Sequence, residues 1–157
     1  MRIAHVVATF PPHYTGTGMV CYYNALGLAR LGHEVTVFTA DTAMGDYVDP
    51  DEIAVRRLPA LFRIGNAPFL PGLLGVRGFD VVHVHYPFIF GAEMVWAVSR
   101  LRGIPYVLTH HNDLIGDGMR RHLFAAYSAV SAPLVLGGAA RLVTVSLDHA
   151  GSSRLAS

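Results

Sequence analysis

The sequence IAHVVATFPPHYTGTG, residues 3–18, indicates the fold class most clearly. Its first half is an apolar run of strand length, and two prolines then lead into Gly16-Thr17-Gly18. Apolar residues at helical spacing follow over residues 19–31, and Gly32 stands where a helix commonly ends. Glycines beside a helix start let a bound group approach the backbone, where the first N–H groups carry the partial positive charge of the helix. We therefore predict a strand–loop–helix unit that binds an anion, above all a phosphate, at Gly16, Thr17 and Gly18.

The rest of the chain continues this alternation of strands and helices. We predict further strands at residues 34–40, 53–58, 81–85, 105–109 and 141–146. Helices are predicted at residues 93–101 and at about 118–137, where Pro133 is expected to kink or break the second one. Strands buried on both faces and separated by helices indicate an α/β fold: a Rossmann-like, doubly wound, mainly parallel sheet with helices on both faces. With 157 residues, 52% of them hydrophobic, residues 1–157 should form one domain.

Composition limits the partners and the compartment. Twelve Lys and Arg residues against 11 Asp and Glu give a net charge of +1, which argues against a nucleic-acid partner. A single cysteine, Cys21, excludes an internal disulfide and a thiolate-rich zinc site. The opening apolar run is too short for a secretory signal, and no apolar stretch reaches the ~18 residues of a spanning helix. We expect a cytoplasmic protein.

Candidate site residues gather where the predicted strands end. In doubly wound sheets ligands bind beyond the carboxyl ends of the strands, where Gly16, His85, His111 and Ser146 fall. Histidine suits a sugar site because its two ring nitrogens can donate and accept hydrogen bonds at neutral pH. His83 and His85 lie on one face of a strand and, with His111, form a possible metal set, but a structural role is favoured and no metal is expected.

Five motifs then follow one another in a characteristic order. They are Pro11-Pro12 with the glycine loop, GHEVTV at 32–37, DVVHVH at 80–85, VLTHH at 107–111 and VTVS at 143–146. Together they resemble the amino-terminal domain of the retaining GT-B glycosyltransferases of family 4. The resemblance implies transfer of a sugar from a nucleotide diphosphate donor to an acceptor hydroxyl with retention, without a metal or other cofactor.

The resemblance also implies roles for individual residues. Gly16 and Gly18 would lie on the side of the donor diphosphate, although Thr15 replaces the usual first glycine of the loop. The Thr-x-His motif falls on residues 109–111, so that His111 would contact the transferred sugar or position it near the acceptor. His85 and Asn112 are further predicted substrate-binding residues. His110 should point to the opposite face and serve packing.

In such enzymes a second domain supplies the charged residues that hold the donor. The chain is therefore expected to be a truncated, acceptor-side fragment that lacks the C-terminal donor-binding domain and is inactive by itself. Its partners would be the nucleotide sugar, the hydroxyl acceptor and its own C-terminal domain. Ser146 is expected to cap a helix that runs toward Ser157.

Three alternatives stay open. Gly16-x-Gly18 with Asp41, an acid placed for a ribose hydroxyl, also resembles a dinucleotide-binding fingerprint of an oxidoreductase, although Cys21 takes the third glycine position. A non-catalytic nucleotide-sugar-binding module is the second. The third concerns Arg56 to Leu74, where arginines alternate with apolar residues: this segment is either an ordinary loop or a peripheral contact with the inner face of the membrane.

Overall fold

The computed structural model describes residues 1–64, 67–112 and 119–144, apart from the side chains of 119–121 and 123. The elements in chain order are β1 (Arg2–Val6), α1 (Gly16–Arg30), β2 (Glu34–Ala40), β3 (Ala54–Leu58), β4 (Phe62–Ile64), β5 (Ala67–Phe69), the 3-10 helix η1 (Pro71–Gly75), β6 (Val81–Tyr86), α2 (Gly91–Arg102), β7 (Tyr106–His110), α3 (Met119–Gly138) and β8 (Arg141–Thr144). The predicted alternation of strands and helices is confirmed.

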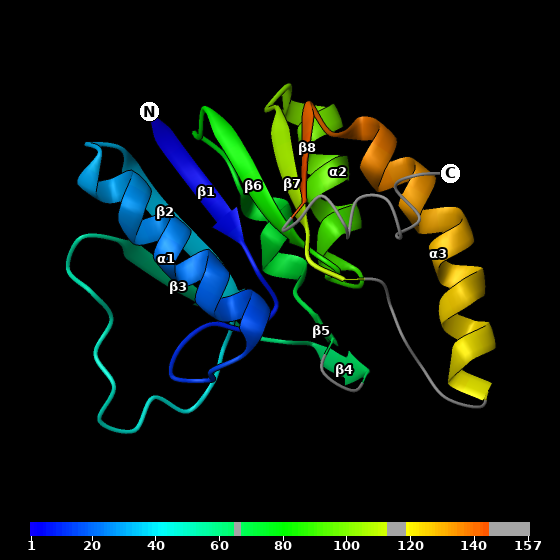
Figure 1. Cartoon of the computed structure of the whole chain (residues 1–157), viewed down its shortest axis with the longest axis horizontal. Coiled ribbons are helices and arrows are strands. Elements are labelled where there is room, and N and C mark those ends of the chain that lie inside the picture. The colour runs from blue at the N-terminus through cyan, green and yellow to red at the C-terminus, as the bar shows by residue number, and fades with distance from the viewer. Residues whose placement is uncertain (65–66, 113–118, 145–157) are drawn as a thin grey trace.

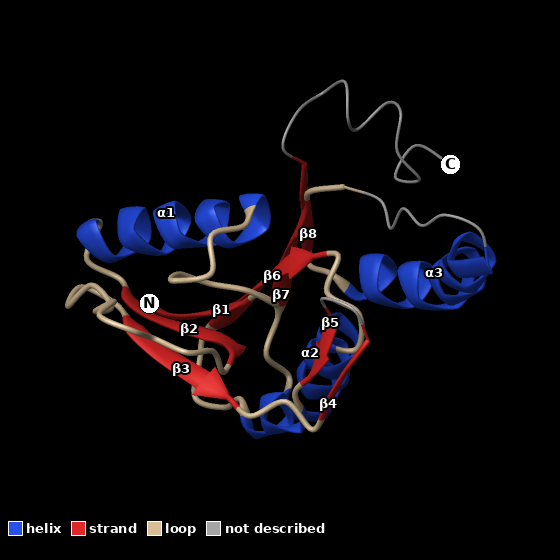
Figure 2. Ribbon diagram, turned by 90° about the horizontal axis from the view of Figure 1, so that it is seen from below, coloured by secondary structure: helices blue, strands red, loops and turns tan. Residues whose placement is uncertain are grey.

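The main sheet has six parallel strands in the order β3-β2-β1-β6-β7-β8 (Figure 1). The chain builds outward from β1 to β3 and then returns to the other side of β1 with β6, so the strand order reverses between β1 and β6. In Figure 2, α1 covers one face of the sheet and α2 the other. The predicted Rossmann-like, doubly wound architecture is confirmed, and the carboxyl ends of β1, β6 and β7 meet at one edge beside the reversal.

The two faces of β1 enter different cores because side chains alternate along a strand. Ile3 packs with Cys21 and Ala25 of α1, whereas Ala4 and Val6 belong to the larger cluster formed with α2 and η1. The first apolar run therefore stays buried after its strand ends. We expected this strand to reach residue 10, but it stops at Val6, and the loop beyond it is buried instead of paired.

Helix α1 begins at Gly16, three residues before the predicted start. Thr15 is its N-cap, and the Thr15 hydroxyl accepts a 3.1 Å hydrogen bond from the Gly18 N–H. A capping threonine satisfies one of the otherwise unpaired N–H groups of the first turn. Gly16 and Gly18 therefore belong to the helix and not to a loop before it. The prediction of residues 19–31 missed this first turn because it followed apolar spacing alone.

Two further predictions need correction. Pro133 lies inside α3, which continues to Gly138, so of the predicted kink or break only the break is wrong. Val135 is fully buried and its carbonyl accepts a hydrogen bond from the Tyr106 hydroxyl, which stabilises the turn that Pro133 weakens. Between β3 and β6, where we predicted no regular structure, the antiparallel hairpin β4–β5 and η1 are present.

Within the described residues no helix combines the length and apolar character needed to cross a bilayer.

Candidate functional site

Histidines from three neighbouring strands meet on the face of the sheet that α1 covers. The parallel register pairs His5 of β1 with His83 of β6, and His85, two residues further along β6, lies on the same face. His111 follows directly on β7, and its backbone N–H donates to the Tyr86 carbonyl at 2.9 Å. This bond continues the pairing of β6 and β7 and holds His111 at the carboxyl edge of the sheet.

The rings of His5, His85 and His111 form a hydrogen-bonded row. His5 Nδ1 lies 3.1 Å from His85 Nε2, and His85 Nδ1 lies 3.1 Å from His111 Nε2. His5 and His85 are fully buried, and His111 is half-buried. His83 lies beside this row and is hydrogen-bonded through Nε2 to the Thr109 hydroxyl at 2.7 Å. The row therefore leads from the interior of the sheet to a residue that a ligand can reach.

Burial keeps the inner histidines neutral. Desolvation, followed by repulsion from His83, lowers the pKa of His5 from 6.5 to about 3. Desolvation and repulsion from His111 lower the pKa of His83 to about 4. The pKa of His85 lies well below its ordinary value for the same main reason, and the neighbouring rings add to the shift. Removal from water disfavours an imidazolium, and stacked histidines disfavour one another's charge.

These distances change the roles predicted from the sequence. We expected His85 to bind substrate, but its ring is 0% exposed and lies between two other imidazoles, so a direct contact does not fit this structure. His5 lies in the core, and the sequence did not indicate that it belongs to the row. His110 is 2% exposed and stacks on Tyr86, which confirms its packing role. Asn112 is exposed.

Two N–H groups in the first turn of α1 are hydrogen-bonded to the chain, and two are not bonded to its described residues. The N–H groups of Gly18 and Met19 both donate to Thr15, one to its side chain and one to its carbonyl. Those of Gly16 and Thr17 make no hydrogen bond to the described part of the chain. Of the three predicted phosphate-side positions, Gly16 and Thr17 therefore keep a donor for a ligand.

Gly18 has a packing reason to lack a side chain. A Cβ placed on it would lie 2.7 Å from the Thr9 carbonyl oxygen and 2.9 Å from Thr15 Oγ1, both shorter than van der Waals contact. The Thr9 and Thr15 hydroxyls are themselves hydrogen-bonded at 2.6 Å. Helix α1 thus starts close against the loop that follows β1, and only glycine permits this approach. A Cβ on Gly16 would meet nothing within 4 Å.

A cavity of about 270 Å³ opens beside the same edge of the sheet. Its lining comes from residues 8–10 and His13 after β1, from Asp41 and Thr42 after β2, and from Arg63 of β4. Arg63 donates to the Asp41 carbonyl at 2.9 Å. Asp41 is therefore placed as the dinucleotide alternative requires, but Gly16 and Gly18 are not among the described residues that line the cavity.

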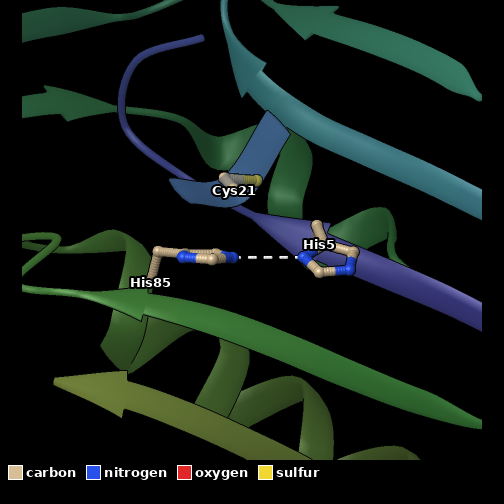
Figure 3. A group of neighbouring side chains, drawn as sticks. All are labelled: His5, Cys21 and His85. Atoms are coloured by element: carbon tan, nitrogen blue, oxygen red, sulfur yellow. Dashed lines mark hydrogen bonds between the residues drawn. The ribbon is translucent and has the colours of Figure 1, made fainter. Parts of the chain in front are cut away.

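The structure brings together a different set of possible metal ligands from the one predicted. His5, Cys21 and His85 offer ligand atoms within 4.8 Å of one another, and all three residues are buried (Figure 3). Burial raises the pKa of the Cys21 thiol, so this side chain stays protonated, as expected for a small core residue. Tetrahedral zinc would need N···N and N···S separations of ~3.4–3.6 Å. The two imidazoles are instead joined directly, with His5 Nδ1 3.1 Å from His85 Nε2, a hydrogen-bond distance.

The remaining charged and polar candidates lie elsewhere. Arg57 donates to both carboxylate oxygens of Asp49 and, at 2.7 Å, to the Pro11 carbonyl, so it holds the loop before α1. Arg56 lies over the Phe38 ring, 6.0 Å from its centroid. The strand-end position Ser146 and its predicted helix toward Ser157 fall outside the described residues.

Comparisons with known proteins agree with this architecture. Among curated proteins, the chain is 34% identical over 128 residues to a GDP-mannose-dependent alpha-mannosyltransferase of Mycolicibacterium smegmatis, which covers 74% of this chain and 34% of the relative. It is 30% identical over 129 residues to an uncharacterized glycosyltransferase of Methanocaldococcus jannaschii, covering 74% of this chain and 32% of the relative. The chain thus spans about a third of the length of these relatives.

A solved structure shares the fold. An alpha-glucosyltransferase in complex with UDP and a 13-mer DNA superposes over 94% of this chain and 38% of its own, with a TM-score of 0.55 and 14% sequence identity. The family model described as the glycosyl transferase 4-like domain matches residues 15–154. This match runs from the N-cap of α1 past the last described strand. The chain belongs to the glycosyl transferase 4-like family.

Proposed function

We propose that this chain is the acceptor-side domain of a retaining glycosyltransferase, which moves a sugar from a nucleotide diphosphate donor to an acceptor hydroxyl. Family membership supports the reaction class. The observation that carries the site is the position of His111, half-buried at the carboxyl edge of the sheet and hydrogen-bonded to His85. Only β6 separates the β7 end from β1, so His111 and the loop that starts α1 leave strands about 10 Å apart.

The chemistry at this edge is hydrogen-bond donation. As the glycosidic bond to the donor breaks, negative charge develops on the leaving diphosphate. The N–H groups of Gly16 and Thr17 and the positive end of the α1 dipole are suited to stabilise that charge. His111 would contact the transferred sugar, and exposed Asn112, the next residue, would assist in binding it. No metal takes part in this proposal.

The donor to test first is GDP-mannose. The curated relatives of Mycolicibacterium smegmatis and Mycobacterium tuberculosis are both described as GDP-mannose-dependent alpha-mannosyltransferases. We propose that a C-terminal donor-binding domain completes the enzyme, and that the 157-residue chain has no transferase activity by itself. Accumulation of a mannosylated product by the purified chain with GDP-mannose would contradict the second statement.

The decisive test is His111→Ala in the enzyme that carries this domain. Loss of a group that acts at the reacting sugar typically lowers kcat by ~100-fold or more, with a smaller effect on KM. The matched control is His33→Ala, the same substitution at the opposite end of the sheet, where His33 lies next to the start of β2. Turnover by His111→Ala equal to that of the His33 variant would refute the role of this imidazole.

Ligand binding separates the proposal from the oxidoreductase alternative. The cavity beside Asp41 is the feature that favours a dinucleotide. Calorimetric titration of the enzyme with NAD and with GDP-mannose decides between them: binding of the sugar nucleotide alone is expected. Binding of NAD alone, abolished by Asp41→Ala, would support the dinucleotide site instead.

A peripheral membrane contact is a separate proposal for Arg56 to Leu74. The side chains of Leu61, Phe62, Ile64 and Leu74 are 72%, 44%, 50% and 47% exposed. Arg57 is used inside the protein, so anionic lipid would be met by exposed Arg63 beside these apolar groups. Such a contact would place the enzyme at the inner face of the membrane. Co-sedimentation with anionic vesicles should fall when Leu61 and Ile64 are both changed to Ser; equal sedimentation with neutral vesicles would remove the proposal.

A further inference from the structure

The distances between the three imidazoles do not show which ring donates and which accepts in each hydrogen bond. A neutral imidazole carries one N–H donor and one bare nitrogen acceptor. Both nitrogens of His85 are engaged, one by His5 and one by His111, at 3.1 Å each. If His85 donates to one neighbour, it must therefore accept from the other. Only two arrangements of protons satisfy the row, and they place opposite groups on His111.

The inner end of the row selects one arrangement. His5 Nε2 is buried and makes no hydrogen bond within the described part of the chain. If this nitrogen carried a proton, the row would end in an orphaned donor, whereas a bare nitrogen leaves only an unused acceptor. Unpaired buried donors are the rarer and costlier case. His5 therefore carries its proton on Nδ1 and donates to His85 Nε2, and His85 then donates through Nδ1 to His111 Nε2.

Cys21 agrees with this direction. Its sulfur belongs to the close group that Figure 3 shows around His5 and His85. Because burial keeps the thiol protonated, Cys21 takes no proton from either ring. Burial lowers the pKa of both His5 and His85, so these two rings enter the row as neutral groups.

We propose that His5 and His85 are positioning residues that fix His111 in the tautomer with its proton on Nδ1. Because Nε2 of His111 accepts the hydrogen bond from His85, the proton of His111 stands on Nδ1. A contact of Nδ1 with an oxygen of a sugar or phosphate is then made by a hydrogen-bond donor and not by a base. This statement rests on the proposed function only for the identity of the ligand; the tautomer is a property of the folded chain.

Histidine tautomers can be observed directly by nuclear magnetic resonance. The 17.0 kDa chain is small enough for long-range ¹H–¹⁵N spectra after labelling of its histidine ring nitrogens, which distinguish protonated from bare nitrogens. At neutral pH we expect His5, His85 and His111 all to carry the proton on Nδ1, with signals assigned by single substitutions. A proton on Nε2 of His111, or a doubly protonated His85, would overturn the proposal.

A pair of substitutions at His85 tests causation. The amide nitrogen of Asn lies near the place of the imidazole Nδ1, so His85→Asn retains a donor for His111, whereas His85→Leu removes it. The Nδ1–H tautomer of His111 should persist in the Asn variant and give way to a mixture with Nε2–H in the Leu variant. Thr109→Val, which removes the partner of His83 but leaves the row intact, is the matched control and should change nothing at His111. An unaltered His111 tautomer in folded His85→Leu would refute the coupling.

Three outcomes separate this inference from a metal site and from the proposed function. Stoichiometric zinc that shifts the ring nitrogens of His5 and His85 in the chelator-treated chain would mean that the group around Cys21 binds metal, and would overturn the proposal; unchanged spectra support it. If the tautomer is as expected but His111→Ala retains full turnover, the proposed function fails and the row stands. If turnover is lost but His111 carries its proton on Nε2, the function stands and the row fails.

Discussion

We predict that the buried histidines make the stability of this domain strongly dependent on pH. His5, His83 and His85 all have a pKa below its ordinary value of 6.5, about 3 for His5 and about 4 for His83. In the unfolded chain each would bind a proton as the pH falls through ~6.5, whereas in the folded chain each stays neutral. The unfolded state therefore takes up more protons between pH 6.5 and pH 4, and folding stability falls as the pH falls.

The size of this loss of stability depends only on the histidine pKa in the unfolded chain, as long as the pKa in the folded chain lies below the pH of the measurement. At pH 5 protonation stabilises each of these histidines in the unfolded chain by about 2 kcal/mol. The three histidines together therefore lower the free energy of unfolding by about 6 kcal/mol relative to pH 7. Domains of this kind are stabilised by only ~5–15 kcal/mol. We expect a large part of the stability to be lost at pH 5, before most carboxylates titrate.

Urea unfolding followed by circular dichroism at pH 7.5, 6.5, 5.75 and 5 measures this effect. The slope of the unfolding free energy against pH should approach ~4 kcal/mol per pH unit at the acid end, which corresponds to three protons. His83→Gln should lower the uptake by one proton. Ile3→Val, which shortens a neighbouring core side chain at a cost of about 1 kcal/mol, should lower stability without changing the slope. An uptake below one proton in the unaltered chain would refute the reasoning.

Three other predictions concern the start of α1 and the row. Gly18→Ala should cost about 1–3 kcal/mol in urea unfolding because its Cβ would meet the Thr9 carbonyl at 2.7 Å, whereas Gly16→Ala, with open space, should be neutral or stabilising; equal costs would contradict the packing argument. Thr15→Ala should cost about 1 kcal/mol through loss of the N-cap and Thr15→Ser much less, also by urea unfolding, and two equal losses would speak against capping. In the enzyme, His85→Leu should lower kcat by ~10-fold with little change in KM while His85→Asn retains most activity; a KM effect alone would argue for substrate binding by His85.

The elements that the sequence predicts well are those with two-sided burial. Strand β2, Glu34–Ala40, is found at the predicted residues, since six of its seven residues are buried and a glycine with φ +85° precedes it. The start of α1 was misplaced although its signal was present: Thr15 stands three residues before Gly18, the spacing of a capping side chain and its N–H partner. Because Gly16 and Gly18 were assigned to a loop, Thr15 was not recognised as the N-cap.

Other features of the structure could not be predicted from local sequence patterns. Strands β4 and β5 have three residues each, too few to show alternation, and Pro68 within β5 is an unfavourable strand residue away from an edge. The histidine row depends on the register between β1 and β6, which pairs His5 with His83 and brings His85 within reach of two strands. The proximity of His85 and His111 was predicted from the ends of their strands, but the contact with His5 required knowledge of the register between β1 and β6.

The start of α1 and the buried histidines contribute hydrogen-bond donors and no positive charge. Gly16 and Thr17 present backbone N–H groups, and His111 is joined to rings that stay neutral. Of the arginines near this edge in the described chain, Arg57 is paired with Asp49, whereas Arg63 donates to the Asp41 carbonyl and keeps its charge. A diphosphate leaving group carries more than one negative charge, and dipoles alone stabilise it less than a fixed cation does. We therefore expect a catalytically competent enzyme to use further cations besides Arg63, while the buried histidines orient His111 without adding a charge that would repel them.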